Sequence, residues 1–156
     1  MPLLIGWNKD EMTIFNTGAP WFGQLTEQAL PERVAQVVGD KADALLAVYR
    51  EMYPDYSPTY LYNAILGDSR MFIGSVLLAE RQAALGGAPV YMYYLTWETP
   101  VGGGVFKSPH TLDIPFMFAN VDRAVALTGD GPGARALEDQ MSGAWIAFAR
   151  TGRPGH

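Results

Sequence analysis

The sequence predicts an α/β fold built on parallel strands, and three observations support this prediction. Residues 3–7 and 90–97 have the short apolar or aromatic character of strands. The long stretch between them carries apolar residues at helical spacing, and strands connected through helices are typical of a parallel crossover. Because two strands are too few for a free-standing sheet, and the first begins almost at the N-terminus, we expect this chain to be part of a larger fold.

Four helices are expected between the two strands. Each begins at a residue suited to a helix N-terminus, and glycine or proline interrupts the pattern between them. Pro31, inside the first helix, argues for a break or a restart near Leu30. The expected starts are Thr26 for residues 26–38, Asp40 for 41–53, Ser57-Pro58 for a helix from 58, and Asp68 or Ser69 for 70–85.

The second half contains the strongest strand and the last helix. Residues 90–97 are rich in aromatic and β-branched side chains and are bounded by Pro89 and Pro100. No repeat, linker or low-complexity tract divides the chain, so residues 1–156 are predicted to belong to a single domain. After the strand we expect a glycine-containing loop over 99–109, short helical pieces near 111–118 and 121–127, and a helix over 134–150.

Composition narrows the classes of function and of partner. The 156 residues are 49% apolar and 17% charged, which suits one globular core. The net charge of -5 disfavours nucleic acid as a partner, and the absence of cysteine excludes disulfides and cysteine nucleophiles. No segment has the apolar length of a membrane span, and the N-terminus lacks the basic region of a signal peptide. We expect a soluble protein, with a cytoplasmic location slightly favoured, although a secreted protein without cysteine fits as well.

Histidine is the most informative residue type, because the chain contains only two. His156 is the terminal residue, whereas His110 follows the glycine-containing loop after the strand at 90–97. Loops past the carboxyl end of a strand are where open α/β sheets place their chemistry. His110 is therefore a candidate general base, and the alternative is a surface or half-buried loop histidine. A single internal histidine without cysteine does not predict a transition-metal site.

Glu11 is the second candidate. It lies just past the carboxyl end of the strand at 3–7, where a carboxylate could hold the tautomer of a histidine and stabilise its imidazolium form. The alternative is an acidic residue near a helix N-terminus, which the helix dipole favours.

The chain supplies no nucleophile with the expected surroundings. A serine nucleophile elbow requires Gly-x-Ser-x-Gly between a strand and a helix. The glycines at 102–104 resemble an oxyanion-hole loop, but their position just before His110 favours a flexible loop instead. Five serines are present and none has the elbow spacing: Ser57, Ser69, Ser75, Ser108 and Ser142.

Several segments from end to end of the chain carry recognisable motifs. They are 3–11 (LLIGWNKDE), 68–72 (DSRMF), 88–93 (APVYMY), His110 with 113–116 (DIPF), 127–129 (LTG), and Met141 with 145–152 (WIAFARTG). Together, and in this order, they resemble the type-B carboxylesterase and cholinesterase family. Met12 and Thr111 are departures, because many members have glycine at these two positions.

The resemblance implies a partial α/β-hydrolase fold, in which the two strands are the last two of the main sheet. It implies that Glu11 is the acid and His110 the general base of a catalytic triad, with Asp113 in a supporting role. The substrate would be a carboxylic ester and no cofactor would be needed. The family's serine and its glycine-rich oxyanion segment lie upstream of Leu3, so we expect this chain alone to be nearly inactive.

Two other functions are compatible with the sequence. Some adhesion proteins keep this fold and lose the triad, although the presence of both Glu11 and His110 argues against such a non-catalytic role. An independent helix-rich binding module would be a stable monomer with a covered sheet. A fragment should instead expose a strand edge and self-associate, or pair with the missing N-terminal part.

Overall fold

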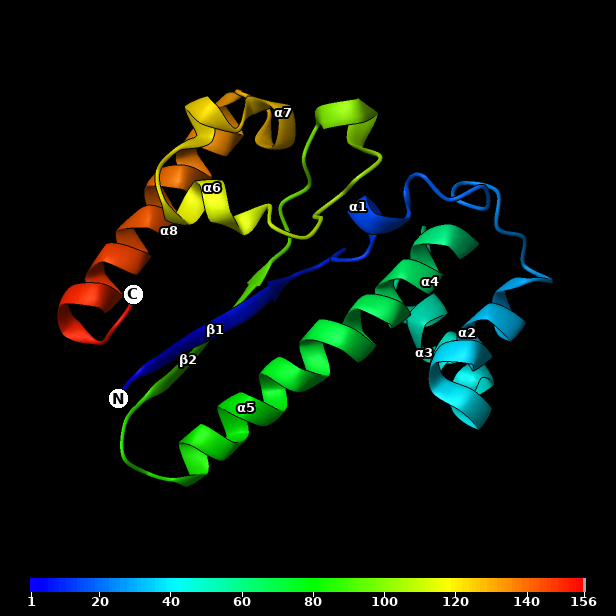
Figure 1. Cartoon of the computed structure of the whole chain (residues 1–156), viewed down its shortest axis with the longest axis horizontal. Coiled ribbons are helices and arrows are strands. Elements are labelled where there is room, and N and C mark those ends of the chain that lie inside the picture. The colour runs from blue at the N-terminus through cyan, green and yellow to red at the C-terminus, as the bar shows by residue number, and fades with distance from the viewer. Residues whose placement is uncertain (156) are drawn as a thin grey trace.

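The two predicted strands lie side by side in a parallel sheet (Figure 1). The computed structural model describes residues 1–155. Strand β1 (Leu3–Asn8) pairs with β2 (Val90–Leu95) in a register that runs from Leu3 opposite Val90 to Asn8 opposite Leu95. Both strands therefore end at the same edge of the sheet, which brings the segments that follow them together.

A long helix covers each face of this sheet. Helix α5 (Ile73–Ala84) lies along one face and α8 (Pro132–Thr151) along the other (Figure 1). Side chains alternate between the faces of a strand. Trp7 accordingly packs on Phe72 just before α5, at 4.8 Å between ring centroids, whereas Tyr93 packs on Trp145 of α8 at 5.0 Å.

Gly6 allows the two strands to fit at the centre of the sheet. A Cβ atom at Gly6 would lie 2.2 Å from the carbonyl oxygen of Tyr93 and 2.4 Å from its ring. Only a residue without a side chain leaves room for this aromatic ring. The Tyr93 ring therefore lies against Gly6, and its hydroxyl donates to Asp113 beyond the end of the sheet.

The helices that precede α5 in the chain form a second layer of structure beyond the carboxyl end of β1 (Figure 1). Their apolar faces build one core cluster, whose most buried members include Leu30, Val34, Leu46 and Leu61. The helix expected from Thr26 begins only at Leu30, where Pro31 predicted a break or restart, and Ala29 is its N-cap. The Thr26 side chain instead accepts a hydrogen bond from the amide of Ala29 in the turn before the helix. The elements are α1 (Thr13–Asn16), α2 (Leu30–Val38), α3 (Ala42–Met52) and α4 (Pro58–Gly67).

Two further predicted helix starts were wrong. Asp40 lies in a 3₁₀ turn (Gly39–Lys41), and Lys41 occupies the N-cap position of α3. Neither Asp68 nor Ser69 caps a new helix, because α4 continues through a π-helical turn (Asp68–Phe72) into α5. The Asp68 carboxylate instead accepts a hydrogen bond from the Tyr49 hydroxyl of α3, a tertiary contact that local sequence does not reveal.

The segment after β2 folds back over the end of the sheet. β2 ends at Leu95, two residues before its predicted end, and Trp97 packs against Phe116 at 5.2 Å. Phe116 is fully buried in a second core cluster with Leu112 and Val121. The elements are a 3₁₀ turn (Val101–Gly104), α6 (Asp113–Met117), a 3₁₀ turn (Val121–Arg123), α7 (Val125–Thr128) and α8.

None of the helices within residues 1–155 combines the length and the apolar character needed to cross a bilayer.

Candidate active site

Two loops meet at the carboxyl edge of the sheet. The acid loop (residues 9–12) follows β1, and the histidine loop (residues 104–112) returns to it after β2. The amide of Asp10 donates to the carbonyl of Ser108 at 2.9 Å, and the amide of His110 donates to the carbonyl of Glu11 at 3.3 Å. These backbone contacts extend the pairing of the two strands and hold the loops side by side.

Glu11 and His110, the two residues predicted to carry the chemistry, are in direct contact. Glu11 Oε2 lies 2.6 Å from His110 Nδ1. The other carboxylate oxygen, Oε1, accepts a hydrogen bond from the amide of Asn8 at 2.7 Å, and Glu11 is only 5% exposed. Because an ionised carboxylate can only accept hydrogen bonds, this geometry places the imidazole proton on Nδ1 and leaves a lone pair on Nε2.

The opposite edge of the His110 ring is accessible. The His110 side chain is 38% exposed, and it lies beside the Phe15 ring at 5.3 Å between centroids. Within residues 1–155 the protein makes no hydrogen bond to Nε2 of His110. An imidazole held at Nδ1 by a buried carboxylate and open at Nε2 has the arrangement of a general base.

The serines nearby do not complete a triad. Ser108, two residues before His110, is fully buried and donates its hydroxyl proton to the carbonyl of Leu95 at 3.0 Å. Among the described residues, no serine hydroxyl is hydrogen-bonded to His110. The part of the chain that the structure describes also gathers no three histidine or acidic side chains that could hold a metal ion. His156 lies outside the described residues.

Asp113, predicted to support the site, lies at the start of α6 and joins the two strands. Its Oδ1 accepts from the side-chain amide of Asn8 at 3.1 Å, and its Oδ2 accepts from the Tyr93 hydroxyl at 2.6 Å. The Asn8 amide also donates to the carbonyl of Pro109 at 2.8 Å, directly before His110. Burial and the hydrogen bond to Asp113 raise the pKa of Tyr93, so its hydroxyl keeps its proton and remains a donor.

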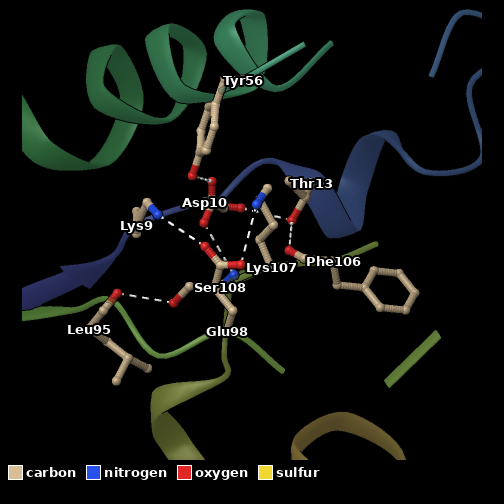
Figure 2. Close-up of polar contacts among 9 residues, drawn as sticks. All are labelled: Lys9, Asp10, Thr13, Tyr56, Leu95, Glu98, Phe106, Lys107 and Ser108. Atoms are coloured by element: carbon tan, nitrogen blue, oxygen red, sulfur yellow. Dashed lines mark hydrogen bonds and ion pairs between the residues drawn. The ribbon is translucent and has the colours of Figure 1, made fainter. Parts of the chain in front are cut away.

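Sequence reasoning did not identify Asp10, which lies at the centre of a buried polar network (Figure 2). Asp10 Oδ1 accepts from the Tyr56 hydroxyl at 2.9 Å, and Oδ2 accepts from the amide of Ser108 at 3.2 Å. Burial raises the pKa of Asp10, although the hydrogen bond from Tyr56 and the charge of Lys9 partly oppose this rise. In the sequence, only its position next to Glu11 could have pointed to Asp10, because its partners Tyr56 and Ser108 are 46 and 98 residues away.

Beside this network, the Glu98 carboxylate forms ion pairs with two lysines (Figure 2). Glu98 accepts from the ammonium group of Lys9 at 3.0 Å and from that of Lys107 at 3.2 Å. Both ammonium groups also lie over the Tyr56 ring, at 5.2 Å and 4.8 Å from its centroid. Partial burial raises the pKa of Glu98, but the hydrogen bonds and charges of the two lysines outweigh it, so the net shift is downward.

Met12 and Thr111, the two positions without the glycine expected from the resemblance, differ in their surroundings. Met12 is 4% exposed and packs into the core of the helical layer. Thr111 follows His110 with φ of 69°, a left-handed conformation that is unfavourable for a β-branched residue. The glycines at 102–104 also have positive φ and form the tight turn that leads into the histidine loop, as part of the 3₁₀ turn after β2.

No protein-family model matches the chain. Three curated proteins are similar to it over 99% of its length. They are the phenmedipham hydrolase of Pseudarthrobacter oxydans (28% identical over 159 residues), the para-nitrobenzyl esterase of Bacillus subtilis (28% over 156) and the fumonisin B1 esterase of Sphingopyxis macrogoltabida (30% over 163). The chain spans only 28 to 31% of the length of these relatives.

Solved structures show the same relation. An esterase from Clostridium hathewayi that can hydrolyse aliphatic aromatic polyesters superimposes with a TM-score of 0.67 at 28% identity, and a para-nitrobenzyl esterase with 0.64 at 26%. Each match covers the whole chain and 30% of the solved structure. The chain therefore has part of an α/β-hydrolase fold, which confirms the predicted fold class, and its relatives are esterases at low identity.

Proposed function

We propose that this chain is the C-terminal part of a serine carboxylesterase, of the type-B kind, and that it supplies the acid and the histidine of a Ser-His-Glu triad. The observation that carries the proposal is the contact of 2.6 Å between Glu11 Oε2 and His110 Nδ1 at the carboxyl edge of two parallel strands. The similarity of the whole chain to esterases supports the same reaction class. The nucleophilic serine and the oxyanion hole would come from a segment outside this sequence.

The proposed reaction is acyl transfer to serine followed by hydrolysis. The serine hydroxyl attacks the carbonyl carbon of the ester while His110 Nε2 accepts its proton, and His110 then gives that proton to the departing alcohol. A water molecule, deprotonated by the same nitrogen, then attacks the acyl-serine, and His110 returns the proton to the serine oxygen as the bond to the carboxylic acid breaks. Glu11 holds the Nδ1 proton throughout and stabilises the imidazolium that forms, without itself becoming protonated. No step requires a cofactor.

Asp113 is proposed to support His110 by holding the backbone around it. It receives hydrogen bonds from Asn8 at the end of β1 and from Tyr93 on β2, and Asn8 also binds the carbonyl of Pro109. This network ties the backbone before His110 and the helix after it to both strands. Asp113 does not contact the imidazole through any of these bonds, so its role is in positioning.

The test supplies the missing serine from a relative. The chain replaces the matching 30% of the Bacillus subtilis para-nitrobenzyl esterase, and hydrolysis of p-nitrophenyl acetate is measured for chimeras whose folding has been checked by circular dichroism. We expect turnover by the chimera and only background from the 156-residue chain alone. His110→Ala should lower kcat of the chimera by about 10⁶-fold and Glu11→Gln by about 10⁴-fold.

The outcomes separate the candidate functions. A folded, active chimera that is unaffected by His110→Ala would contradict the assigned base. Turnover by the chain alone that is lost in His110→Ala would show that another nucleophile works with His110. A folded chimera without activity would favour a non-catalytic relative of the esterases.

A further inference from the structure

Asp10 is a buried acid that the proposed reaction does not use. It is 1% exposed and lies next to Glu11 in the acid loop. Both oxygens of its carboxylate have partners, the Tyr56 hydroxyl at Oδ1 and the Ser108 amide at Oδ2 (Figure 2). A carboxylate is seldom buried unless its hydrogen bonds are satisfied, and here they are satisfied by groups from two other segments.

The contacts with Ser108 form a closed link between the two loops. Asp10 accepts from the Ser108 amide through its side chain at 3.2 Å and donates to the Ser108 carbonyl through its backbone at 2.9 Å. The Ser108 hydroxyl in turn binds the carbonyl of Leu95 at the end of β2. Ser108 is thus fixed on three sides, and His110 lies two residues further along the same loop.

Tyr56 anchors this link to the helical layer. Its ring stacks on Tyr53 at 4.8 Å between centroids, and the ammonium groups of Lys9 and Lys107 lie over it. Burial and the neighbouring charge of Asp10 raise the pKa of Tyr56, so the hydroxyl stays protonated and donates to Asp10. The Asp10 carboxylate therefore joins three parts of the chain: the acid loop, the histidine loop and the segment between α3 and α4.

We propose that Asp10 is a positioning residue for the Glu11–His110 pair, because its carboxylate, held by the Tyr56 hydroxyl, fixes Ser108 and thereby sets the spacing of the two loops. The effect of Asp10 on catalysis rests on the proposed esterase function, whereas its effect on the spacing of the two loops does not. A displacement of about 1 Å between catalytic groups can lower a rate by about 100-fold, so the spacing of these loops is a critical quantity.

A purely structural role for Asp10 makes a different prediction. If the network only stabilised the fold, its loss would lower the free energy of unfolding without changing the hydrogen bond between Glu11 and His110. The chain offers a matched control for this alternative in Tyr49, whose hydroxyl binds the carboxylate of Asp68 where α4 passes into α5. Burial raises the pKa of Tyr49 as it does that of Tyr56, but the Tyr49 hydroxyl binds Asp68 and donates no hydrogen bond to either loop.

The test observes the His110 imidazole directly by NMR. The 156-residue chain is labelled with ¹⁵N-histidine, and His156→Gln leaves His110 as the only histidine. The readout is the downfield Nδ1 proton and its rate of exchange with water, assigned by its loss in Glu11→Gln. Folding of every variant is checked by circular dichroism and urea unfolding.

We expect Asp10→Ala to abolish the Nδ1 proton signal and Tyr56→Phe to accelerate its exchange several-fold. Asp10→Asn should retain the signal, because the amide oxygen can accept from Ser108 while its NH₂ group donates to the Tyr56 oxygen. Tyr49→Phe should leave the signal unchanged.

The proposal would be overturned if folded Asp10→Ala kept the Nδ1 proton signal with an unchanged exchange rate. It would also be overturned if Tyr56→Phe and Tyr49→Phe changed the exchange rate equally. If Asp10→Ala does not fold, the comparison of the two tyrosine variants decides. A wild-type chain without a Glu11-dependent signal also contradicts the proposal, because the pair to be positioned would be absent. The NMR measurement involves no ester. If the chimera is inactive but the Nδ1 proton signal depends on Asp10, the esterase function is refuted and the positioning role of Asp10 is not.

Discussion

Polar side chains are buried at the carboxyl ends of the strands, whereas large apolar and aromatic side chains within β2 are partly exposed. At the ends, the polar residues Asn8, Asp10 and Ser108 are 1%, 1% and 0% exposed, whereas Met92 and Tyr94 within β2 are 42% and 43% exposed. Globular proteins usually bury apolar rather than polar side chains. The loops of this chain are therefore held by hydrogen bonds of buried polar groups, in addition to the apolar burial of Met12 and Leu112 within the same loops.

Nearly every polar group at the strand ends has a partner within the chain. Among the buried side-chain nitrogen and oxygen atoms of the described residues, only Asn8 Oδ1 makes no hydrogen bond. Buried polar networks rigidify a structure when they are complete and are costly when one member is lost. The site's supporting structure should consequently be sensitive to single changes, and the following variants test the two regions in decreasing order of expected effect.

The largest effect is expected at Gly6, within the strands. Gly6→Ala should lower the free energy of unfolding by about 3 kcal/mol or more, because its Cβ would lie 2.2 Å from the carbonyl oxygen of Tyr93. Gly74→Ala in α5 is the matched control, since a methyl group there would meet no heavy atom within 4 Å, and it should stabilise by about 0.5–1 kcal/mol. Urea unfolding measures both, and equal losses would show that the strand spacing is not the cause.

A gain in stability of about 1 kcal/mol is expected for Thr111→Gly in the histidine loop. Glycine relieves the strain of a β-branched residue at φ of 69°, and this gain should exceed the entropy that glycine adds to the unfolded chain. Thr17→Gly is the control, because Thr17 has an ordinary φ of -58° and should lose stability instead. Thermal unfolding distinguishes the two, and a lower Tm for Thr111→Gly would refute strain at this position.

The smallest effect is expected for Glu98→Gln, at the surface of the polar network. Glu98 is 41% exposed, so loss of its pairs with Lys9 and Lys107 should cost at most about 1 kcal/mol and less at high salt. Its pKa is lowered below the ordinary 4.5 on folding, so its contribution is present above that value and is lost as pH falls through the folded pKa. Urea unfolding at a series of pH values from neutral to acid should show a difference between the two proteins that shrinks as the pH falls. A loss that persists in acid would point to packing of the side chain and not to its charge.

The order of the elements could be predicted from sequence because it depends on local pattern. The apolar run at 3–7, the aromatic run at 90–97 and the helical spacing at 134–150 each locate an element within a few residues of its observed bounds. The continuous passage from α4 into α5 was missed, because a π-helical turn depends on tertiary contacts such as that between Tyr49 and Asp68. Sequence spacing also selected Glu11 and His110 as candidates, since loops past strand ends are few.

By itself, the sequence determined which segments are strands and helices and which residues follow the strand ends, because period and turn residues act over a few positions. Only the tertiary structure decided that Glu11, and not the adjacent Asp10, faces His110, and that Asp10 turns to Tyr56 and Ser108 instead. Successive side chains leave the backbone in different directions, and their partners lie 46 to 99 residues away. Contacts across such separations are set by the parallel register of β1 and β2 and by the packing of the helices between them, which no local pattern encodes.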